Sequence, residues 1–205
     1  IGRVNKGKIK DKIKFNTRVV GTTFQNGKFE VNYQDKVNDK ILIDKFDYVV
    51  VSTGHFSVPF IPEYKGMNSF PGRIMHSHDF RDAVEFRNKN VIVLGSSYSA
   101  EDVALQCNKY GAKSVTIGYR HNPMGFKWPK GMKEVHYLDR LEGKKAFFKD
   151  GTEQEADVII LCTGYLHHFP FLEENLQLKT RNRLYPPKLY KGCLLYTSPS
   201  PRDFV

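Results

Sequence analysis

Residues 91–118 contain a strand, a turn of small residues, a helix and a second strand, and this order restricts the fold more than any other feature. Val91–Leu94 is apolar and mostly β-branched, as in a strand buried within a parallel sheet. The helix expected over Ala100–Tyr110 is followed by Gly111, which tolerates the positive φ of a C-terminal cap. Ser114–Gly118 is the next strand. Such a βαβ unit predicts an α/β fold with a right-handed crossover.

The turn between the first strand and the helix lies where a dinucleotide-binding fingerprint lies in such units. In the pattern G-x-G-x-x-G/A the first glycine and the last small residue are present, and Ser97 replaces the middle glycine. The N–H groups and the positive dipole end of a helix N-terminus attract phosphate. The residues expected to bind a pyrophosphate are therefore Gly95, Ser96, Ser97, Tyr98, Ser99 and Ala100. The alternative is a capped helix that only packs on the sheet.

The end of the following strand distinguishes the two nicotinamide cofactors. An NAD site usually places Asp or Glu there, to bind the ribose 2′-hydroxyl. This chain has no acid at that point and has Arg120 instead, about 25 residues beyond Gly95. A guanidinium suits bidentate binding of a phosphate, which a carboxylate would repel. The sequence therefore predicts NADP(H), with Arg120 as a surface residue at a strand end as the alternative.

The first fifty residues predict further strands. Asn26-Gly27 lies between the β-prone runs Arg18–Phe24 and Lys28–Tyr33, which is a strong hairpin signal. Lys40–Ile43 is expected to add a third strand. The continuous apolar run Tyr48–Val51 is typical of a buried parallel strand.

The segments on either side of the βαβ unit predict a long connection, a hairpin and a further strand. Residues 55–90 are rich in proline and glycine and predict a long connection with one short helix near Asp79–Arg87. A hairpin is expected over Arg140–Thr152, and Asp157–Leu161 is expected to be a buried strand. The segments after two strands, Ser52-Thr-Gly54 and Cys162-Thr-Gly164, resemble each other. This resemblance predicts two nucleotide-binding units.

Composition excludes several other classes. The formal net charge is +10, but the lysines are scattered and form no basic motif interleaved with aromatic residues, so we expect no nucleic-acid partner. No apolar run approaches the roughly 20 residues that cross a bilayer, so we expect no membrane partner. The three cysteines form no C-x-x-C pair and no metal-ligand spacing, and no metal site is predicted. The cytoplasm is the expected compartment.

Both ends predict that the sequence is part of a longer protein. Residues 193–203, Cys-Leu-Leu-Tyr-Thr-Ser-Pro-Ser-Pro-Arg-Asp, correspond to the in-frame translation of an adapter used in transposase-based sequencing libraries. We interpret residues 193–205 as a sequencing artefact without ordered structure. The alternative is a loop rich in proline and serine.

Several motifs resemble one known family. Phe70-Pro-Gly-Arg-Ile-Met-His76-Ser-His-Asp-Phe80 fits F-x-G-x-x-x-H-x-x-x-F/Y, the identifying sequence of flavin-containing monooxygenases. The strand end Thr163-Gly-Tyr165 resembles the T-G-Y motif of the same family, and the segments 123–129 and 164–171 resemble its bacterial branch that oxidises trimethylamine. The motifs occur in the family's order over residues 1–192.

The resemblance implies a flavoprotein fold with two dinucleotide-binding domains, in which an NADPH domain is inserted into a Rossmann-like FAD domain. On this pattern residues 1–60 belong to the FAD domain, 61–168 form the NADPH domain with its linker, and 169–192 return to the FAD domain. The glycine motif for FAD and the substrate pocket are expected outside this sequence, and the isolated polypeptide is expected to be inactive.

The resemblance also implies a chemistry. In the family NADPH reduces FAD, and a hydroperoxyflavin then oxygenates the nitrogen or sulfur of small nucleophiles such as trimethylamine. Substrate and O₂ are the expected partners, with a homodimer as one option. Thr53, Gly54, Thr163 and Gly164 match the domain crossings beside the flavin, and His121 lies where the bacterial branch often has threonine.

His76 matches the fingerprint histidine at the domain junction, where an orienting role is expected and no catalytic residue is assigned. Trp128 is expected to fill a gap in the packing. Two alternatives remain, a Baeyer–Villiger monooxygenase and a non-catalytic NADP-binding module. The Baeyer–Villiger fingerprint usually ends in Trp-Pro, whereas this chain has Phe80-Arg81.

Overall fold

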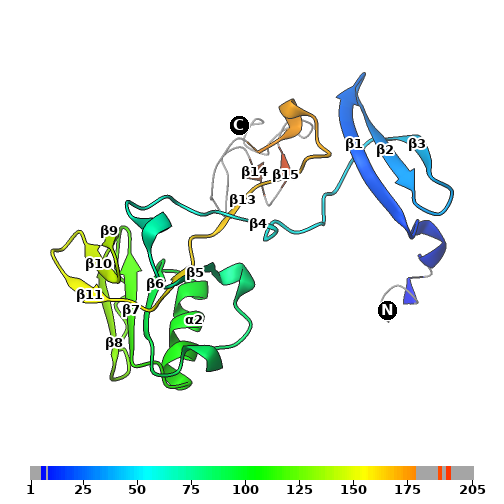
Figure 1. Ribbon diagram of the computed structural model, residues 1–205. Coiled ribbons are helices and arrows are strands. Elements are labelled where there is room, and N and C mark those ends of the chain that lie inside the picture. Colours follow the sequence, from blue (N-terminus) through cyan, green and yellow to red (C-terminus); the bar gives the residue numbers. More distant parts are fainter. Residues whose placement is uncertain (1–5, 8, 179–188, 191–192, 195–205) are drawn as a thin grey trace, which may run out of the picture. The chain divides into compact units, whose positions relative to one another are not determined.

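The computed structural model describes residues 6–7, 9–178, 189–190 and 193–194 (Figure 1). It divides the chain into two compact units, Ile1–His55 with His167–Val205 (unit 1) and Phe56–Leu166 (unit 2). The domain boundaries expected from the sequence, after residues 60 and 168, lie a few residues from these. The assignment of FAD to one unit and NADPH to the other stays a prediction.

Unit 2 is built on a five-stranded parallel sheet in the order β5-β12-β6-β7-β8. Its strands are β5 (Arg73–His76), β6 (Asn90–Leu94), β7 (Ser114–Tyr119), β8 (Met132–His136) and β12 (Val158–Leu161). The helix α2 (Tyr98–Lys109) covers one face of this sheet (Figure 1). A second, antiparallel sheet of β9 (Leu138–Glu142), β10 (Lys145–Phe148) and β11 (Glu153–Glu155) packs on the other face.

Both faces of the parallel sheet are buried because alternate residues of each strand point to opposite sides. On the helix side, Val91, Val93, Val115, Ile117, Val158 and Ile160 pack with Ala100, Val103, Ala104 and Cys107 of α2. On the other side, Ile92, Leu94, Ile159 and Leu161 pack with Leu138, Leu141, Ala146 and Phe148 of the antiparallel sheet. This accounts for the continuous apolar runs in the sequence.

The predicted βαβ unit is present, so the α/β fold class is confirmed. The helix starts at Tyr98, two residues earlier than expected, because Ser97 already has extended backbone angles and forms the N-cap. Gly111 has a φ of +90°, and its N–H donates to Asn108 O at 3.1 Å. The glycine therefore ends the helix as the sequence indicated.

Two strands of the sheet were not expected from the sequence. β5 lies inside the fingerprint segment, and β8 follows a loop and contains a lysine and a glutamate. Neither is a run of β-branched residues, and each is a strand because it pairs with a neighbour at the edge of the sheet. The short helix expected near Asp79–Arg87 is wrong: 3-10 turns at Ser77–Asp79 and Val84–Phe86 take its place.

The first and last residues of unit 2 pair with each other. β4 (Val58–Pro59) and β13 (Tyr165–Leu166) form a two-stranded antiparallel ladder. Phe60 N–H donates to Gly164 O at 2.9 Å, and Thr163 Oγ1 donates to Phe60 O. The segments entering and leaving unit 2 are thus tied together. A further 3-10 turn covers Met67–Ser69.

Unit 1 contains a three-stranded antiparallel sheet of β1 (Thr17–Gln25), β2 (Lys28–Asp35) and β3 (Lys40–Phe46). Asn26 and Gly27 have φ of +52° and +75°, so the predicted hairpin turn between β1 and β2 is confirmed. Glu173 N–H donates to Thr22 O at 3.0 Å, which holds the later segment of the unit against β1. 3-10 turns lie at Lys10–Lys12 and Glu174–Leu176.

The expectation of a buried strand at Tyr48–Val51 is wrong. These residues form no strand, and the exposed fractions of Tyr48 and Val50 are 77% and 85%. A parallel strand needs hydrogen-bonded neighbours, and no strand of the described residues pairs with this segment. Its apolar character alone does not supply them.

The end of the chain lies mostly outside the described residues. β14 (Leu189–Tyr190) and β15 (Cys193–Leu194) pair as a short antiparallel ladder. Residues 179–188, 191–192 and 195–205 are not described, so the interpretation of residues 193–205 as an artefact stays a prediction. In the part of the chain that is described, no helix has the length and apolar character of a membrane span.

Candidate nucleotide-binding site

The turn between β6 and α2 is formed around Gly95. This residue has a φ of +141°, and its N–H donates to Gly118 O of the neighbouring β7 at 2.9 Å. A Cβ at this position would lie 2.3 Å from the carbonyl oxygen of Cys162, so a side chain does not fit. The first glycine of the fingerprint is therefore required for both its backbone angle and its close contact with the end of β12.

Ser97 takes the place of the middle glycine without strain, because its φ is −133° and its ψ is −179°. Its hydroxyl makes no capping hydrogen bond to the helix, and its carbonyl accepts from Ala100 N at 2.8 Å. The N–H groups at the start of a helix have no partner inside it. The turn therefore offers free N–H donors and serine hydroxyls at the positive end of a 12-residue helix.

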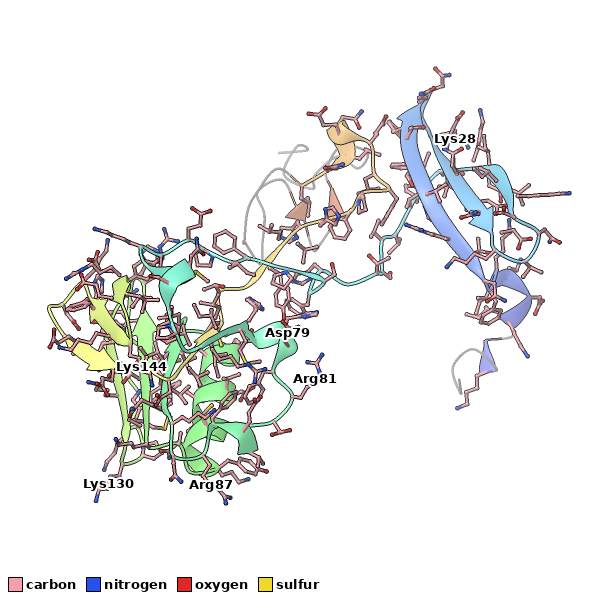
Figure 2. All side chains as sticks on the ribbon, viewed as in Figure 1. Lys28, Asp79, Arg81, Arg87, Lys130 and Lys144 are labelled. Carbon is pink, nitrogen blue, oxygen red and sulfur yellow. The ribbon has the colours of Figure 1, made fainter. Side chains whose placement is uncertain are left out.

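Arg120 lies at the same edge of the sheet as this turn. β6 and β7 are parallel neighbours with Leu94 opposite Gly118, so the residues that follow them emerge side by side. Figure 2 labels Asp79 near this edge, and Arg87 and Lys130 at the opposite edge where the strands begin. Arg120 is exposed and enters no ion pair among the described residues. A free guanidinium beside a phosphate-type turn is suited to a second phosphate.

The loop after Arg120 is held by a carboxylate of the next strand. Glu134 in β8 accepts from Met124 N at 2.7 Å and from Gly125 N at 3.1 Å. Gly125 has a φ of +71°, so the backbone can bring two successive N–H groups to one carboxylate. Trp128 of this loop packs, partly buried, against the core on the helix side of the sheet, as expected. His121 is exposed at the start of the loop.

His76 ends β5 at the same edge of the sheet and is only 3% exposed. Its Nδ1 accepts from His78 N at 3.0 Å, and its ring makes an edge-on contact with Tyr165 at 5.2 Å. Burial lowers the pKa of His76, while the nearby Gly164 backbone acts in the opposite direction. The imidazole is therefore neutral near pH 7 and carries its proton on Nε2.

The thiols near the turn are not nucleophiles. Burial raises the pKa of Cys162 to about 12, against a hydrogen bond with Ser77 that lowers it. Burial likewise raises the pKa of Cys107 in α2 to about 12. A thiol is reactive as its thiolate, so both cysteines are inert packing residues at neutral pH.

The residues predicted for the nucleotide site that belong to unit 2 lie at one edge of its parallel sheet. Thr53 and Gly54 belong to unit 1, where both are exposed and Gly54 has a φ of +76°. The sequence reasoning missed Glu134, Tyr137, Lys149 and Tyr165. Glu134, Tyr137 and Lys149 are marked by no local motif, and Tyr165 belongs to the T-G-Y motif but was not assigned a contact with His76.

Two family models match the chain. The model described as "Pyridine nucleotide-disulphide oxidoreductase" matches residues 6–135, and "Flavin-binding monooxygenase-like" matches residues 131–196. A trimethylamine monooxygenase from Pelagibacter sp. (strain HTCC7211) is 85% identical over 194 residues, which are 95% of this chain and 44% of that protein. The chain thus spans less than half the length of this relative, as expected for part of a longer protein.

Solved structures agree with these matches. The crystal structure of Tmm from Pelagibacter sp. strain HTCC7211 superposes with a TM-score of 0.80 at 86% identity, covering 93% of this chain and 43% of that one. An S-allyl-L-cysteine S-oxygenase from Allium sativum superposes with a TM-score of 0.70 at 30% identity, covering 84% of this chain and 40% of that one. The expected two-nucleotide flavoprotein fold is therefore confirmed for the part that the chain spans.

Proposed function

Since the chain belongs to the pyridine nucleotide-disulphide oxidoreductase family, we propose that the protein containing it uses NADPH and FAD to oxygenate small amines. The resemblance to flavin-containing monooxygenases supports this, because the second family model is flavin-binding monooxygenase-like. The 85% identical relative is named a trimethylamine monooxygenase. Trimethylamine is therefore the proposed substrate, and its N-oxide the product.

The observation that carries the proposal is the edge of the parallel sheet in unit 2. A glycine turn at a helix N-terminus and the exposed Arg120, which has no ion pair within the described part of the chain, follow two neighbouring strands. The turn would hold the pyrophosphate of NADPH, and the guanidinium would bind the ribose 2′-phosphate. These residues fit NADPH better than NADH because no carboxylate ends β7 to bind a free 2′-hydroxyl.

The reaction consumes one amine, O₂, NADPH and a proton, and gives the N-oxide, water and NADP⁺. Bound FAD and NADPH would supply the electron transfer and the activation of O₂. This chain's part is to bind and orient the nucleotide at Gly95–Ala100 and Arg120. His76 is buried with its Nδ1 occupied by His78 N–H, and both thiols are protonated, so we assign orientation and packing to these three side chains.

Sulfur oxygenation is the second candidate. The Allium sativum relative is an S-oxygenase, and it superposes well at 30% identity. A Baeyer–Villiger reaction remains the third, although Phe80-Arg81 departs from the Trp-Pro ending of that fingerprint. A homodimer and a cytoplasmic location stay predictions.

The test uses the full-length protein that contains this sequence. NADPH oxidation and product formation are measured with trimethylamine, a dialkyl sulfide and a cyclic ketone, each with NADH as the control cofactor. We expect the trimethylamine N-oxide to form fastest and with NADPH only. Product from the ketone alone would replace the proposal by a Baeyer–Villiger reaction, and no product from any of the three would contradict an oxygenase.

A further inference from the structure

Two cationic side chains converge on one aromatic ring beside Arg120's strand. The guanidinium carbon of Arg120 lies 6.0 Å from the ring centre of Tyr137, and Nζ of Lys149 lies 5.8 Å from the same centre. Neither cation enters an ion pair with any carboxylate of the described residues. The two come from different elements, 29 residues apart in the chain.

The backbone fixes this convergence. Tyr137 follows β8, which is the parallel neighbour of β7, so it emerges at the same edge as Arg120. Lys149 N–H donates to Tyr137 O at 2.9 Å, which ties the turn after β10 to this edge. Asp150 accepts from His136 N at 3.0 Å and from Thr152 N at 2.9 Å, so the turn is held at a second point.

The tyrosine ring is held as well. Tyr64 packs against it with ring centres 5.6 Å apart, and Tyr64 itself is only 8% exposed. Burial raises the pKa of Tyr64, and the charge of Arg120 lowers it, which agrees with a guanidinium close to this aromatic pair. The ring therefore orients both cations by cation–π contacts from a fixed position.

Charge makes an anion the complement of this arrangement. The positive charges of Arg120 and Lys149 repel each other. A dianion bound between them would attract both and so outweigh this repulsion. The negative group nearest in sequence is Asp150, whose carboxylate accepts two backbone N–H groups that hold the turn. It remains a charge beside Lys149, so the anion must gain more from the two cations than it loses to this carboxylate.

We propose that Lys149 is the second cation for the ribose 2′-phosphate of NADPH, acting with Arg120 across the ring of Tyr137. Arg120 would bind the phosphate oxygens as a planar fork, and Lys149 would add a point charge from the turn after β10. Tyr137 is then a positioning residue that sets the directions of both. This inference rests on the proposed use of NADPH, and it names a specificity residue that no sequence motif marks.

The test measures dissociation constants of NADP⁺ and NAD⁺ for the full-length protein and its Lys149→Met variant. We expect NADP⁺ binding to weaken about tenfold, the size of one partly exposed charge-assisted contact, and NAD⁺ binding to change less than twofold. Raising the salt concentration should reduce the difference between wild type and variant. Lys149→Arg, which keeps the charge, should bind NADP⁺ within about threefold of wild type.

Lys144→Met is the matched control, because Lys144 is also an exposed lysine beside the same antiparallel sheet but pairs with Asp157 at 3.5 Å. If Lys149→Met binds NADP⁺ as Lys144→Met does while Arg120→Ala loses it, Lys149 has no such role and the proposed function stands. If the wild type itself shows no preference for NADP⁺ over NAD⁺, both the proposed use of NADPH and the role of Lys149 are wrong. Circular dichroism of each variant separates these outcomes from misfolding, and Lys149→Gln repeats the test if the methionine variant misfolds.

Discussion

Unit 1 and unit 2 both contain sheets rich in β-branched and aromatic residues. Only in unit 2 do other elements cover both faces of a sheet in the described part of the chain. The buried strands of unit 2 have residues such as Ile92 and Ile160 at 0% exposure, between α2 and the antiparallel sheet. In unit 1, Ile41 and Ile43 of β3 are 66% and 59% exposed. The same residue types thus give a closed core only where elements on both faces cover them, and unit 2 alone has this among the described residues.

The largest expected difference concerns the two cores. Phe86→Ala in unit 2 should lower the free energy of unfolding by about 3–5 kcal/mol, because the side chain is fully buried. Phe46→Ala in unit 1, where the ring is 43% exposed, should cost about 1 kcal/mol. Urea unfolding followed by hydrogen exchange in each unit measures both. Equal losses would mean that unit 1 has a core of its own.

Two glycines sharpen the comparison. Gly95→Ala should destabilise unit 2 by about 3 kcal/mol, because the positive φ adds to a contact at 2.3 Å from Cys162 O. Gly27→Ala has the same kind of backbone angle, φ +75°, but no atom within 4 Å of the added Cβ, and should cost about 1 kcal/mol. Thermal unfolding of the two variants measures both losses. A Gly95→Ala protein as stable as the wild type would contradict the close contact between Gly95 and Cys162 O.

Two carboxylates that hold turns give a smaller effect. Glu134→Gln should lower hydrogen-exchange protection of the Met124 and Gly125 amides by about tenfold, since one of the two acceptor oxygens is lost. Asp35→Asn in unit 1 removes one carboxylate oxygen beside Val37 N, in a turn where Val37 is exposed, and should change protection less. Unchanged exchange at both amides of the 121–131 loop would contradict the role of Glu134.

The pH dependence of the two units should also differ. Burial lowers the pKa of His76 below its ordinary 6.5, so the unfolded chain takes up a proton first and unit 2 loses stability as pH falls through about 6.5. The pKa of Asp44 is lowered by Lys14 and Tyr33, so the stability it gives unit 1 is lost only below about 3.8. In the His76→Asn variant, the free energy of unfolding of unit 2 should change less between pH 8 and pH 5 than in the wild type. An unchanged pH dependence of this free energy would mean that a group other than His76 causes it.

Sequence alone predicted the elements whose reasons are local. The β6–α2–β7 unit and the β1–β2 hairpin follow from apolar runs, a helix-ending glycine and Asn26-Gly27, and all are present. β5 and β8 were missed because pairing at the sheet edge, rather than propensity, makes them strands. Tyr48–Val51 failed for the opposite reason, since propensity without a partner strand gives no sheet.

The candidate site divides in the same way. Gly95 and Arg120 could be predicted because a turn and a strand end have fixed places in a βαβ unit. Lys149 and Tyr137 could not, because tertiary hydrogen bonds from Lys149 N–H to Tyr137 O and from His136 N–H to Asp150 bring the turn after β10 to this edge. Local chemistry thus predicts the phosphate turn, and tertiary contacts determine which further side chains surround it.

The central claim is that the edge of the unit 2 sheet selects a nucleotide with a 2′-phosphate. The most direct measurement compares dissociation constants of NADPH and NADH for the full-length protein and its Arg120→Ala variant. We predict that the variant loses about 1.5–3 kcal/mol of NADPH binding, the worth of a charge-assisted contact, and leaves NADH nearly unchanged. An equal loss for both nucleotides would contradict the assignment of Arg120 to the 2′-phosphate.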